Sequence, residues 1–310
     1  MPSTGPPYID PGVLWELLYI YDLDTEDIEH IEGKRNAIPR PHRVRTEQIV
    51  HNESFQEWMI LPVSTRILIS GNFSGVMLEA SALSLFCTTL VNAFRKRENC
   101  LCLVWFCGQH LGYSDDSDSD SDFGDSDDGF YPDVDGEGYE SGTKVSVIRR
   151  MMRSLIAQLV SDYAFGTVCL LPPDIDEAIM EQGCTLEELS RIFCGLVRQL
   201  PEHITLFCLL DGIYIYERQE FEDPMLEVLG DILQLTTDRD IPATIKVLVT
   251  SPRPTSTVRV GFERNDYDPY TGEKKDLILS LDTLTPAHAD FRAERLERNL
   301  GNVADETVEA

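Results

Sequence analysis

The sequence predicts a three-layer α/β fold with a five-stranded parallel sheet. Short apolar runs that favour β-strands alternate along the chain with longer segments in which apolar residues recur every three or four positions. That alternation is typical of a parallel sheet covered by helices on both faces, because strands buried on both faces are apolar along their whole length. The five expected strands are Arg66–Ser70, Leu101–Phe106, Ile204–Leu210, Ile245–Thr250 and Leu277–Leu281.

The charge balance narrows the classes of partner. The 310 residues include 26 Lys+Arg and 54 Asp+Glu, which gives a formal net charge of −28. Nucleic acids are poor partners for such a chain, because their binding needs basic surfaces that displace counterions from phosphate. No apolar run approaches the roughly 20 residues that cross a bilayer, and no charged-then-apolar leader opens the chain. We therefore expect a soluble protein of the cytoplasm or nucleus with protein partners, and neither nucleic acid nor membrane as a partner.

The first 50 residues carry two different patterns. Residues 1–32 contain Asp10–Ile31, which predicts two short helices with Asp24 as an N-cap, and we interpret this part as an N-terminal helical element. Residues 33–50 carry five basic side chains and two prolines, and the prolines argue against a helix. Composition favours a basic linker there. The alternative is a contact with acidic surface on this chain or on a partner.

Helices are expected between the strands and after the last one. One helix opens with the capping box Thr185 and Glu188, and another opens with Asp223 as its cap and Pro224 at its first helical position. A final helix and a tail are expected over residues 286–310. The α/β domain is thus expected to span residues 51–285, with its internal helices near 81–94, 147–160, 185–197 and 223–233.

An acidic stretch interrupts the alternation at residues 114–142. It contains twelve acidic residues, six serines and no basic residue. Self-repulsion and the lack of apolar side chains predict a disordered insertion. Ser117 and Ser119 each have an acidic residue three positions further on, a context that suits phosphorylation by an acid-directed kinase. A solvated spacer is the alternative.

The eight cysteines lie mostly in apolar segments, where a thiol behaves as a small hydrophobe, so we expect no disulfides. One set, Cys100, Cys102, Cys107 and His110, has a spacing that suggests zinc. Two of its thiols lie at or within an expected strand, whereas structural zinc sites usually take their ligands from turns. The sequence therefore favours a buried strand over a metal centre, and we expect no metal.

A glycine-containing turn, Gly71–Gly75, follows the first strand and precedes a helix, which is where a phosphate-binding loop is found. A working loop, G-x-x-x-x-G-K-[ST], places a lysine on the terminal phosphates and a hydroxyl on magnesium. This turn, which includes Asn72, is followed by Val76–Glu79 and lacks the lysine. At ~4 Å and an effective dielectric constant near 20, one charge pair is worth about 4 kcal/mol. A repelling Glu79 in place of an attracting lysine would therefore outweigh the affinity of a weak nucleotide site.

Polar residues also follow two later strands. Asp211 follows an apolar strand. In NTPases, an aspartate at the end of such a strand binds the magnesium ion of the nucleotide. The alternative is that the Asp211 carboxylate caps the turn after the strand. Gly212 comes next, so no second carboxylate adjoins Asp211 to polarise an attacking water. Ser251 and Arg253 follow the next strand, at the edge where open α/β sheets bind ligands; a surface turn is the alternative.

These motifs resemble the NTPase core of fungal NACHT-type signal-transduction proteins, sometimes described as nephrocystin-3-like P-loop NTPases. The resemblance implies that Gly71–Gly75 is the triphosphate loop, that Asp211 binds magnesium, and that Ser251 and Arg253 sense the nucleotide. No residue matches the loop lysine or its Ser/Thr partner, and the chain stops before any repeat array. The similarity covers about residues 50–285, through the runs Phe55–Trp58, Arg66–Asn72, Phe106–His110, Met151–Leu159, Phe207–Gly212 and Leu248–Pro252.

We expect a degenerate P-loop NTPase-like domain that acts through protein–protein interaction in signalling, with no cofactor and no ATP hydrolysis. Two alternatives stay open. In the first, the chain is an active ATP- and magnesium-binding switch or slow ATPase, and Arg253 or a basic residue of 34–45 supplies the missing charge. In the second, the acidic insert binds basic partners and the α/β domain is its scaffold.

Overall fold

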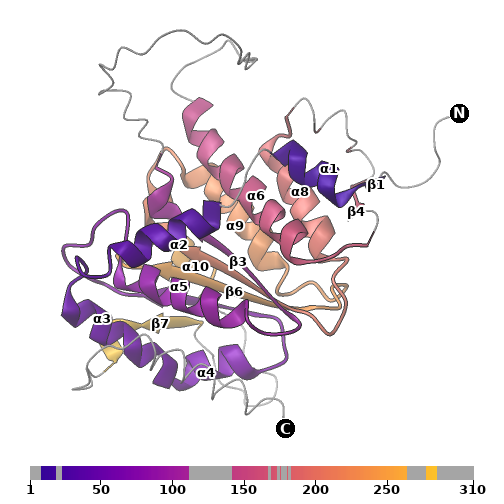
Figure 1. Ribbon diagram of the computed structural model, residues 1–310. Helices are drawn as coiled ribbons and strands as arrows, with labels where there is room; N and C mark the ends of the chain where they lie inside the picture. The colour runs from indigo at the N-terminus through magenta and orange to yellow at the C-terminus, as the bar shows by residue number, and fades with distance from the viewer. Residues whose placement is uncertain are drawn as a thin grey trace, which may run out of the picture.

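The computed structural model describes residues 8–18, 23–111, 142–166, 169–172, 175, 180, 183–263 and 277–284 (Figure 1). Three expectations fall outside the described residues. They are the acidic insert up to residue 141, the phosphorylation candidates Ser117 and Ser119, and the C-terminal helix and tail of residues 286–310.

The expected five-stranded parallel sheet is confirmed. Its strands are β2 (Thr65–Ser70), β3 (Cys100–Phe106), β5 (Thr205–Asp211), β6 (Thr244–Ser251) and β7 (Ile278–Ser280). The order across the sheet is β3-β5-β6-β2-β7, and every neighbouring pair is parallel. The register pairs the last residue of β2 with the last residue of β6, and that of β3 with that of β5. The carboxyl ends of these four strands therefore form one edge of the sheet.

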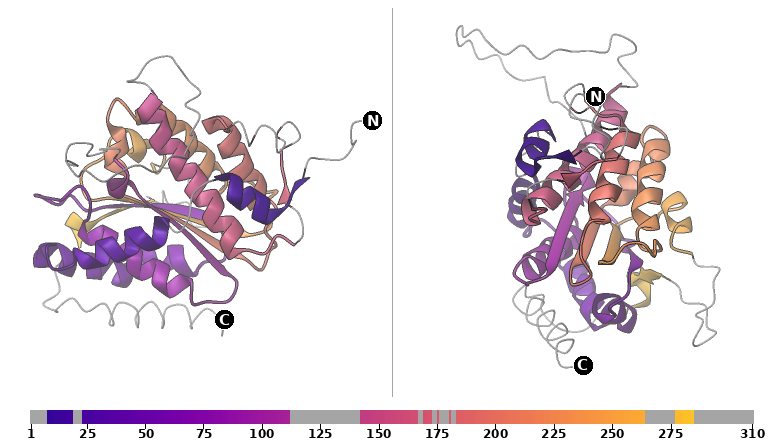
Figure 2. Two further views of the ribbon diagram at one scale, coloured as in Figure 1. Left: turned by 45° about the horizontal axis from the view of Figure 1, so that its top comes forward. Right: turned by 90° about the vertical axis from the view of Figure 1, so that its right-hand side faces the viewer.

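Helices cover both faces of the sheet, which makes three layers (Figure 2). The strands feed two separate cores because their side chains alternate between the faces: Leu103 and Trp105 enter one core, and Cys102 and Val104 enter the other. One face is covered by α6 (Gly142–Asp162), α8 (Leu186–Val197) and α9 (Glu222–Gln234), with α1 (Pro11–Leu18) packed on α6. The other is covered by α2 (Leu23–Gly33), α4 (Glu53–Ile60) and α5 (Ala82–Phe94).

Three helix starts were predicted within the described residues, and two of them differ in the structure. Asp24, which we expected as an N-cap, lies in the first turn of α2 because that helix begins at Leu23. The capping box of α8 is confirmed, since the backbone N–H of Glu188 donates to Thr185 Oγ1 at 3.2 Å and its carboxylate accepts from the backbone N–H of Thr185 at 2.7 Å. The prediction for α9 is wrong. That helix begins at Glu222 after Phe221, so Asp223 is a first-turn residue rather than the cap. Pro224 is tolerated there because the first turn needs no donor from its N–H group.

The basic segment is helical in part, which corrects our expectation that its prolines exclude a helix. Helix α3 spans Arg40–Glu47, with Pro39 as its N-cap residue and Pro41 in its first turn. Proline fits that turn because its fixed φ angle suits a helix and its missing N–H group would have no acceptor there. Arg45 contacts Asp282 at 3.3 Å. The segment thus makes the intramolecular contact with acidic side chains that we considered as the alternative to a linker.

Helix α4 was not expected, and a buried lysine holds it to the sheet. Lys246 lies on β6 and is 1% exposed. Its ammonium group donates to the carbonyl oxygens of Trp58 at 2.7 Å and Leu61 at 2.6 Å, at the C-terminal end of α4. A cation is favourable at that end of a helix because the last carbonyl groups have no intrahelical partner. Burial lowers the pKa of Lys246 to about 7.

The outer edge of β3 is closed by side chains. Gln158 of α6 accepts a hydrogen bond from the backbone N–H of Val104 and donates one to its carbonyl oxygen, both at 2.9 Å. Arg95 donates to the carbonyl oxygen of Cys102 at 3.3 Å. These bonds replace those that a further strand would make, so the sheet ends at β3. A separate two-stranded antiparallel sheet pairs β1 (Tyr8–Ile9) with β4 (Cys169–Leu170).

Candidate functional site

The carboxyl edge of the sheet brings together the residues that the sequence singled out. The N–H of Gly71, just after β2, donates to the carbonyl oxygen of Ser251 at the end of β6, at 2.8 Å. Asp211 ends β5, the neighbour of β6 on the other side. The chain leaves β2 toward the face that carries α5, whereas the residues after β6 enter the opposite core through Val258. Such a divergence marks the point where open α/β sheets form a ligand crevice.

Asp211 is 4% exposed, and its carboxylate is bound by two hydroxyl groups. Ser84 Oγ donates to Oδ2 at 2.6 Å, and Thr250 Oγ1 donates to Oδ1 at 2.5 Å. Burial raises the pKa of Asp211 to about 6, while these two hydrogen bonds act in the opposite direction. The sequence had suggested a turn cap as the alternative role of Asp211. Instead, its side chain ties the first turn of α5 to the end of β6.

Ser84 and Thr250 were not predicted as site residues. Ser84 lies in the first turn of α5, where it completes a capping box with Ser81. In a P-loop the loop hydroxyl and the strand-end aspartate both bind magnesium. If Ser84 is aligned with that hydroxyl, Leu83 falls at the lysine of G-x-x-x-x-G-K-[ST], and Met77 and Ala82 fall at its two glycines, so that neither Gly71 nor Gly75 keeps its expected place in the pattern. Leu83 is fully buried, and its Cδ1 would lie 3.2 Å from a Cβ atom placed on Gly71.

Glu79 does not act as we expected from the sequence. Its carboxylate is 57% exposed and contacts Lys34 at 3.1 Å and His30 at 3.6 Å. The hydrogen bond from Lys34 is the main reason that the pKa of Glu79 is lowered. The repulsion of phosphate that we had assigned to Glu79 is thus offset by a neighbouring cation.

The first half of the loop at residues 71–81 is closed by contacts with three parts of the chain. The N–H of Phe73 donates to the carbonyl oxygen of Pro252 at 2.8 Å. The Phe73 ring is 6% exposed and stacks on His42 of α3, with 4.5 Å between ring centroids. Asn72, which has a φ angle of 46°, donates from Nδ2 to Asp282 at 2.6 Å. Neither expected loop residue, Asn72 nor Gly75, bonds to Asp211.

The second half of the loop is held by a turn after β3 and by Arg253. Gly108 lies so close to the loop that a Cβ atom on it would be 2.1 Å from the carbonyl oxygen of Leu78. Gln109 Nε2 donates to the carbonyl oxygen of Glu79. Arg253 donates to the carbonyl oxygen of Val76 at 3.4 Å. Gly108 is required here because any side chain would push the loop away.

The two expected sensor residues point in different directions. Ser251 is fully buried, and its hydroxyl donates to the carbonyl oxygen of Arg253 at 2.5 Å. The Arg253 guanidinium lies over the ring of Tyr214, at 5.4 Å from the ring centroid. The Ser251 side chain is therefore used to shape the turn after β6, whereas Arg253 reaches across the outside of the closed loop.

The set considered for zinc does not form a metal site. Cys102 and Cys107 are buried, and burial is the main cause that raises the pKa of each thiol. His110 bonds instead to Asp27 of α2, at 2.7 Å. Across the ranges that the structure describes, no three His, Cys, Asp or Glu side chains lie where they could share a metal ion. The seven cysteines whose side chains are described are free thiols.

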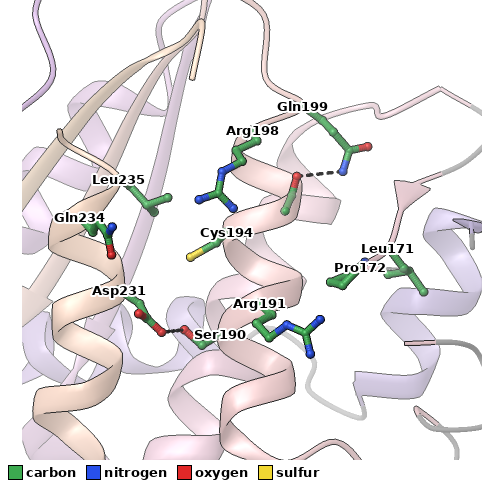
Figure 3. A pocket seen from close by; sticks show the side chains of 11 residues that line it. Leu171, Pro172, Ser190, Arg191, Cys194, Arg198, Gln199, Asp231, Gln234 and Leu235 are labelled. Carbon is green, nitrogen blue, oxygen red and sulfur yellow. Dashed lines mark hydrogen bonds between the residues drawn. The ribbon is translucent and has the colours of Figure 1, made fainter. Parts of the chain in front are cut away.

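A hollow of about 450 Å³ lies on the helical layer, away from this edge (Figure 3). It is lined by α8 from Ser190 onward and the two residues after it, by the C-terminal end of α9 with Leu235, and by the segment Leu171–Pro172. Because α8 ends just before β5 begins, the hollow lies toward the amino ends of the strands. Asp231 in its wall accepts a hydrogen bond from Ser190 at 2.5 Å, and Arg198 is paired with Asp238 at 3.0 Å. No residue predicted from the sequence as a site residue lines it.

Comparisons of the chain with protein-family models, with curated proteins and with solved structures found no match. The similarity to NACHT-type NTPases consequently stays an expectation from short motifs. Within the part of the chain that the structure describes, no helix combines the length and the apolar character that crossing a membrane requires.

Proposed function

We propose that this chain is a degenerate P-loop NTPase-like domain of the NACHT type, which acts in cytoplasmic signalling through protein contacts and does not hydrolyse ATP. One observation carries the proposal. Leu83 is buried beside Gly71, and its neighbour Ser84 bonds to the strand-end carboxylate of Asp211. This arrangement supports a degenerate nucleotide site in which a buried hydrocarbon side chain takes the place of the lysine.

The energetic consequence is large. A lysine ammonium about 4 Å from a phosphate oxygen is worth about 4 kcal/mol at an effective dielectric constant near 20. Its loss weakens binding by roughly a thousandfold, so a micromolar nucleotide site becomes a millimolar one. A triphosphate would also have to displace the Phe73 contacts with Pro252 and His42, which close the loop over the end of β2.

Isothermal titration calorimetry with ATP and magnesium tests the proposal. The wild type is expected to give no heat of binding at micromolar nucleotide. The variant Leu83→Lys restores the missing cation and is the matched gain-of-function test. Leu83→Met keeps the volume and the apolar character, so it controls for repacking. A micromolar dissociation constant for the wild type would overturn the proposal.

The alternative of an active switch is favoured by one specific observation. Two cations contact the loop at residues 71–81, Lys34 through Glu79 at 3.1 Å and Arg253 through the carbonyl oxygen of Val76 at 3.4 Å. If either cation turned inward it could take the place of the lysine. This alternative predicts phosphate release from ATP that disappears in Asp211→Ala and falls in Lys34→Ala or Arg253→Ala.

A further inference from the structure

The closed loop exposes apolar side chains at the carboxyl edge of the sheet. Met77 is 37% exposed and Leu78 is 40% exposed, and Val76 beside them is half-buried. Large apolar side chains scattered singly over a surface need no explanation, but two adjacent ones on a loop at a topological switch point are placed where α/β proteins bind ligands. Methionine is frequent at binding surfaces because its flexible side chain adapts to different partners.

Hydrogen bonds hold the backbone of this loop in place, so the side chains of Met77 and Leu78 project from fixed positions. Arg253 holds the carbonyl oxygen of Val76, and Gln109 holds that of Glu79. Between these two, the carbonyl of Leu78 lies against Gly108. A displayed side chain on a fixed backbone loses less conformational entropy on binding than one on a mobile loop, which favours association.

Two exposed arginines, Arg253 and Arg218, form no ion pair among the residues that the structure describes. The Arg253 guanidinium contacts the carbonyl oxygen of Val76, next to the exposed pair, and the ring of Tyr214. Both lie near Tyr214: burial raises the pKa of that phenol, and the charges of Arg253 and Arg218 act in the opposite direction. In a chain with 54 acidic and 26 basic residues, two exposed arginines near one tyrosine that form no ion pair with a described residue are available to an acidic partner.

We propose that the surface formed by Met77, Leu78, Tyr214, Arg218 and Arg253, here called the loop patch, docks an acidic amphipathic segment of a partner protein. Apolar side chains of the segment cover Met77 and Leu78, and its carboxylates pair with the two guanidinium groups. This inference rests on the proposed function, because it requires the loop to stay closed. Arginine and tyrosine are the residue types that most often dominate protein interfaces.

Charge complementarity selects this occupant over a membrane. An anionic membrane surface attracts clusters of about four to eight basic residues, whereas the loop patch carries two. A short acidic segment meets only the local field of Arg218 and Arg253, which falls off within a Debye length of about 8 Å at physiological ionic strength. The guanidinium fork also matches a carboxylate in a bidentate geometry.

Fluorescence anisotropy with three synthetic peptides tests the loop patch. The peptides share one amphipathic helical sequence with Leu and Phe on one face, and carry Glu, Gln or Lys at the polar positions. The Glu peptide is expected to bind the full chain about tenfold more tightly than the Gln peptide, as two partly exposed charge pairs allow. Vesicles that contain phosphatidylserine form a fourth arm, and binding to them without binding of the Glu peptide would overturn the proposal in favour of a membrane.

Variants locate the binding to the patch. In Arg218→Glu the order of the peptides is expected to reverse, with the Lys peptide now preferred; Arg218 holds no part of the loop, so folding is unaffected. Met77→Ser with Leu78→Ser is expected to abolish binding of every peptide. Val63→Ser is the matched control, because Val63 is an apolar side chain 53% exposed just before β2, at the amino edge of the sheet and away from the patch. Equal affinities for the three peptides, or equal losses in Val63→Ser, would refute the loop patch.

The outcomes separate this inference from the proposed function. Tight ATP binding by the wild type overturns the proposed function, whether or not the peptides bind. Absence of peptide binding, together with absence of ATP binding, leaves the degenerate site intact and removes only the loop patch.

Discussion

Replacing Gly108 by alanine perturbs the backbone of the closed loop and leaves the exposed side chains of the loop unchanged. A Cβ atom at residue 108 would lie 2.1 Å from the carbonyl oxygen of Leu78, and the two atoms must separate by about 0.9 Å to reach even the closest tolerated contact of 3.0 Å. The obstacle is backbone on both sides, so no side-chain rotation relieves it. Forced repacking of this kind costs about 2 kcal/mol of unfolding free energy, which corresponds to a fall in Tm of roughly 4–8 °C.

Urea unfolding and hydrogen exchange read out the two parts of this prediction. Gly108→Ala should lower the urea midpoint, and the amides of residues 76–80 should exchange faster than in the wild type, because the Gln109 bond to Glu79 is lost with the contact. Gly195→Ala in α8 is the matched control. A Cβ atom there meets no atom within 4 Å, so the change should raise stability by about 1 kcal/mol through helix propensity. Unchanged stability and exchange in Gly108→Ala would refute the closed-loop geometry.

Three further predictions concern buried or capping groups. The pKa of Asp211 is raised to about 6, so its contribution to stability is present below pH ~4 and is lost as the pH rises through 6. The unfolding free energy of the wild type should therefore fall by about 3 kcal/mol between these two pH values. Urea titrations of Asp211→Asn should show no such fall. The pKa of Lys246 is lowered to about 7, so its contribution to stability is present above pH ~10.5 and is lost as the pH falls through 7. The unfolding free energy of the wild type should therefore rise between pH 7 and 10, and in Lys246→Met it should not change with pH over this range. Thr185→Ala breaks the capping box of α8 and should lower the unfolding free energy by about 1 kcal/mol, as measured by thermal unfolding.

Each of these predictions has an outcome that contradicts it. A pH profile of Asp211→Asn parallel to that of the wild type would show that the carboxyl does not titrate differently in the folded state. A wild-type stability that falls rather than rises between pH 7 and 10, with no such fall in Lys246→Met, would contradict the lowered pKa of Lys246. No loss of stability in Thr185→Ala would mean that the hydrogen bonds of the Thr185 hydroxyl contribute nothing.

The sheet could be predicted because its strands are marked by local composition. Leu101–Phe106 is apolar along its length and Ile245–Thr250 is apolar except at Lys246 and Thr250, and the structure places both runs in the sheet. The edge at which Asp211 lies followed from the same pattern, since the carboxyl ends of parallel strands meet. These features depend on residues that are neighbours in the sequence.

The partners of Asp211 could not be predicted for the opposite reason. Ser84 is 127 positions away from Asp211, and neither sequence context marks the contact. Lys246 stands within an apolar run, and only the structure shows that α4 ends beside it. The error at α3 had a different cause: we took Pro39 and Pro41 as helix breakers, although proline is excluded only from positions after the first turn.

The central claim is that the place of the phosphate-binding lysine is filled by Leu83 and that the loop above it is shut. A crystal of the wild type soaked with a non-hydrolysable ATP analogue and magnesium tests this claim most directly. The account predicts that Phe73 stays stacked on His42 and that Asp211 keeps its bonds to Ser84 and Thr250, with no analogue beside Gly71. A triphosphate seated on that turn, with magnesium between Ser84 and Asp211, would contradict it.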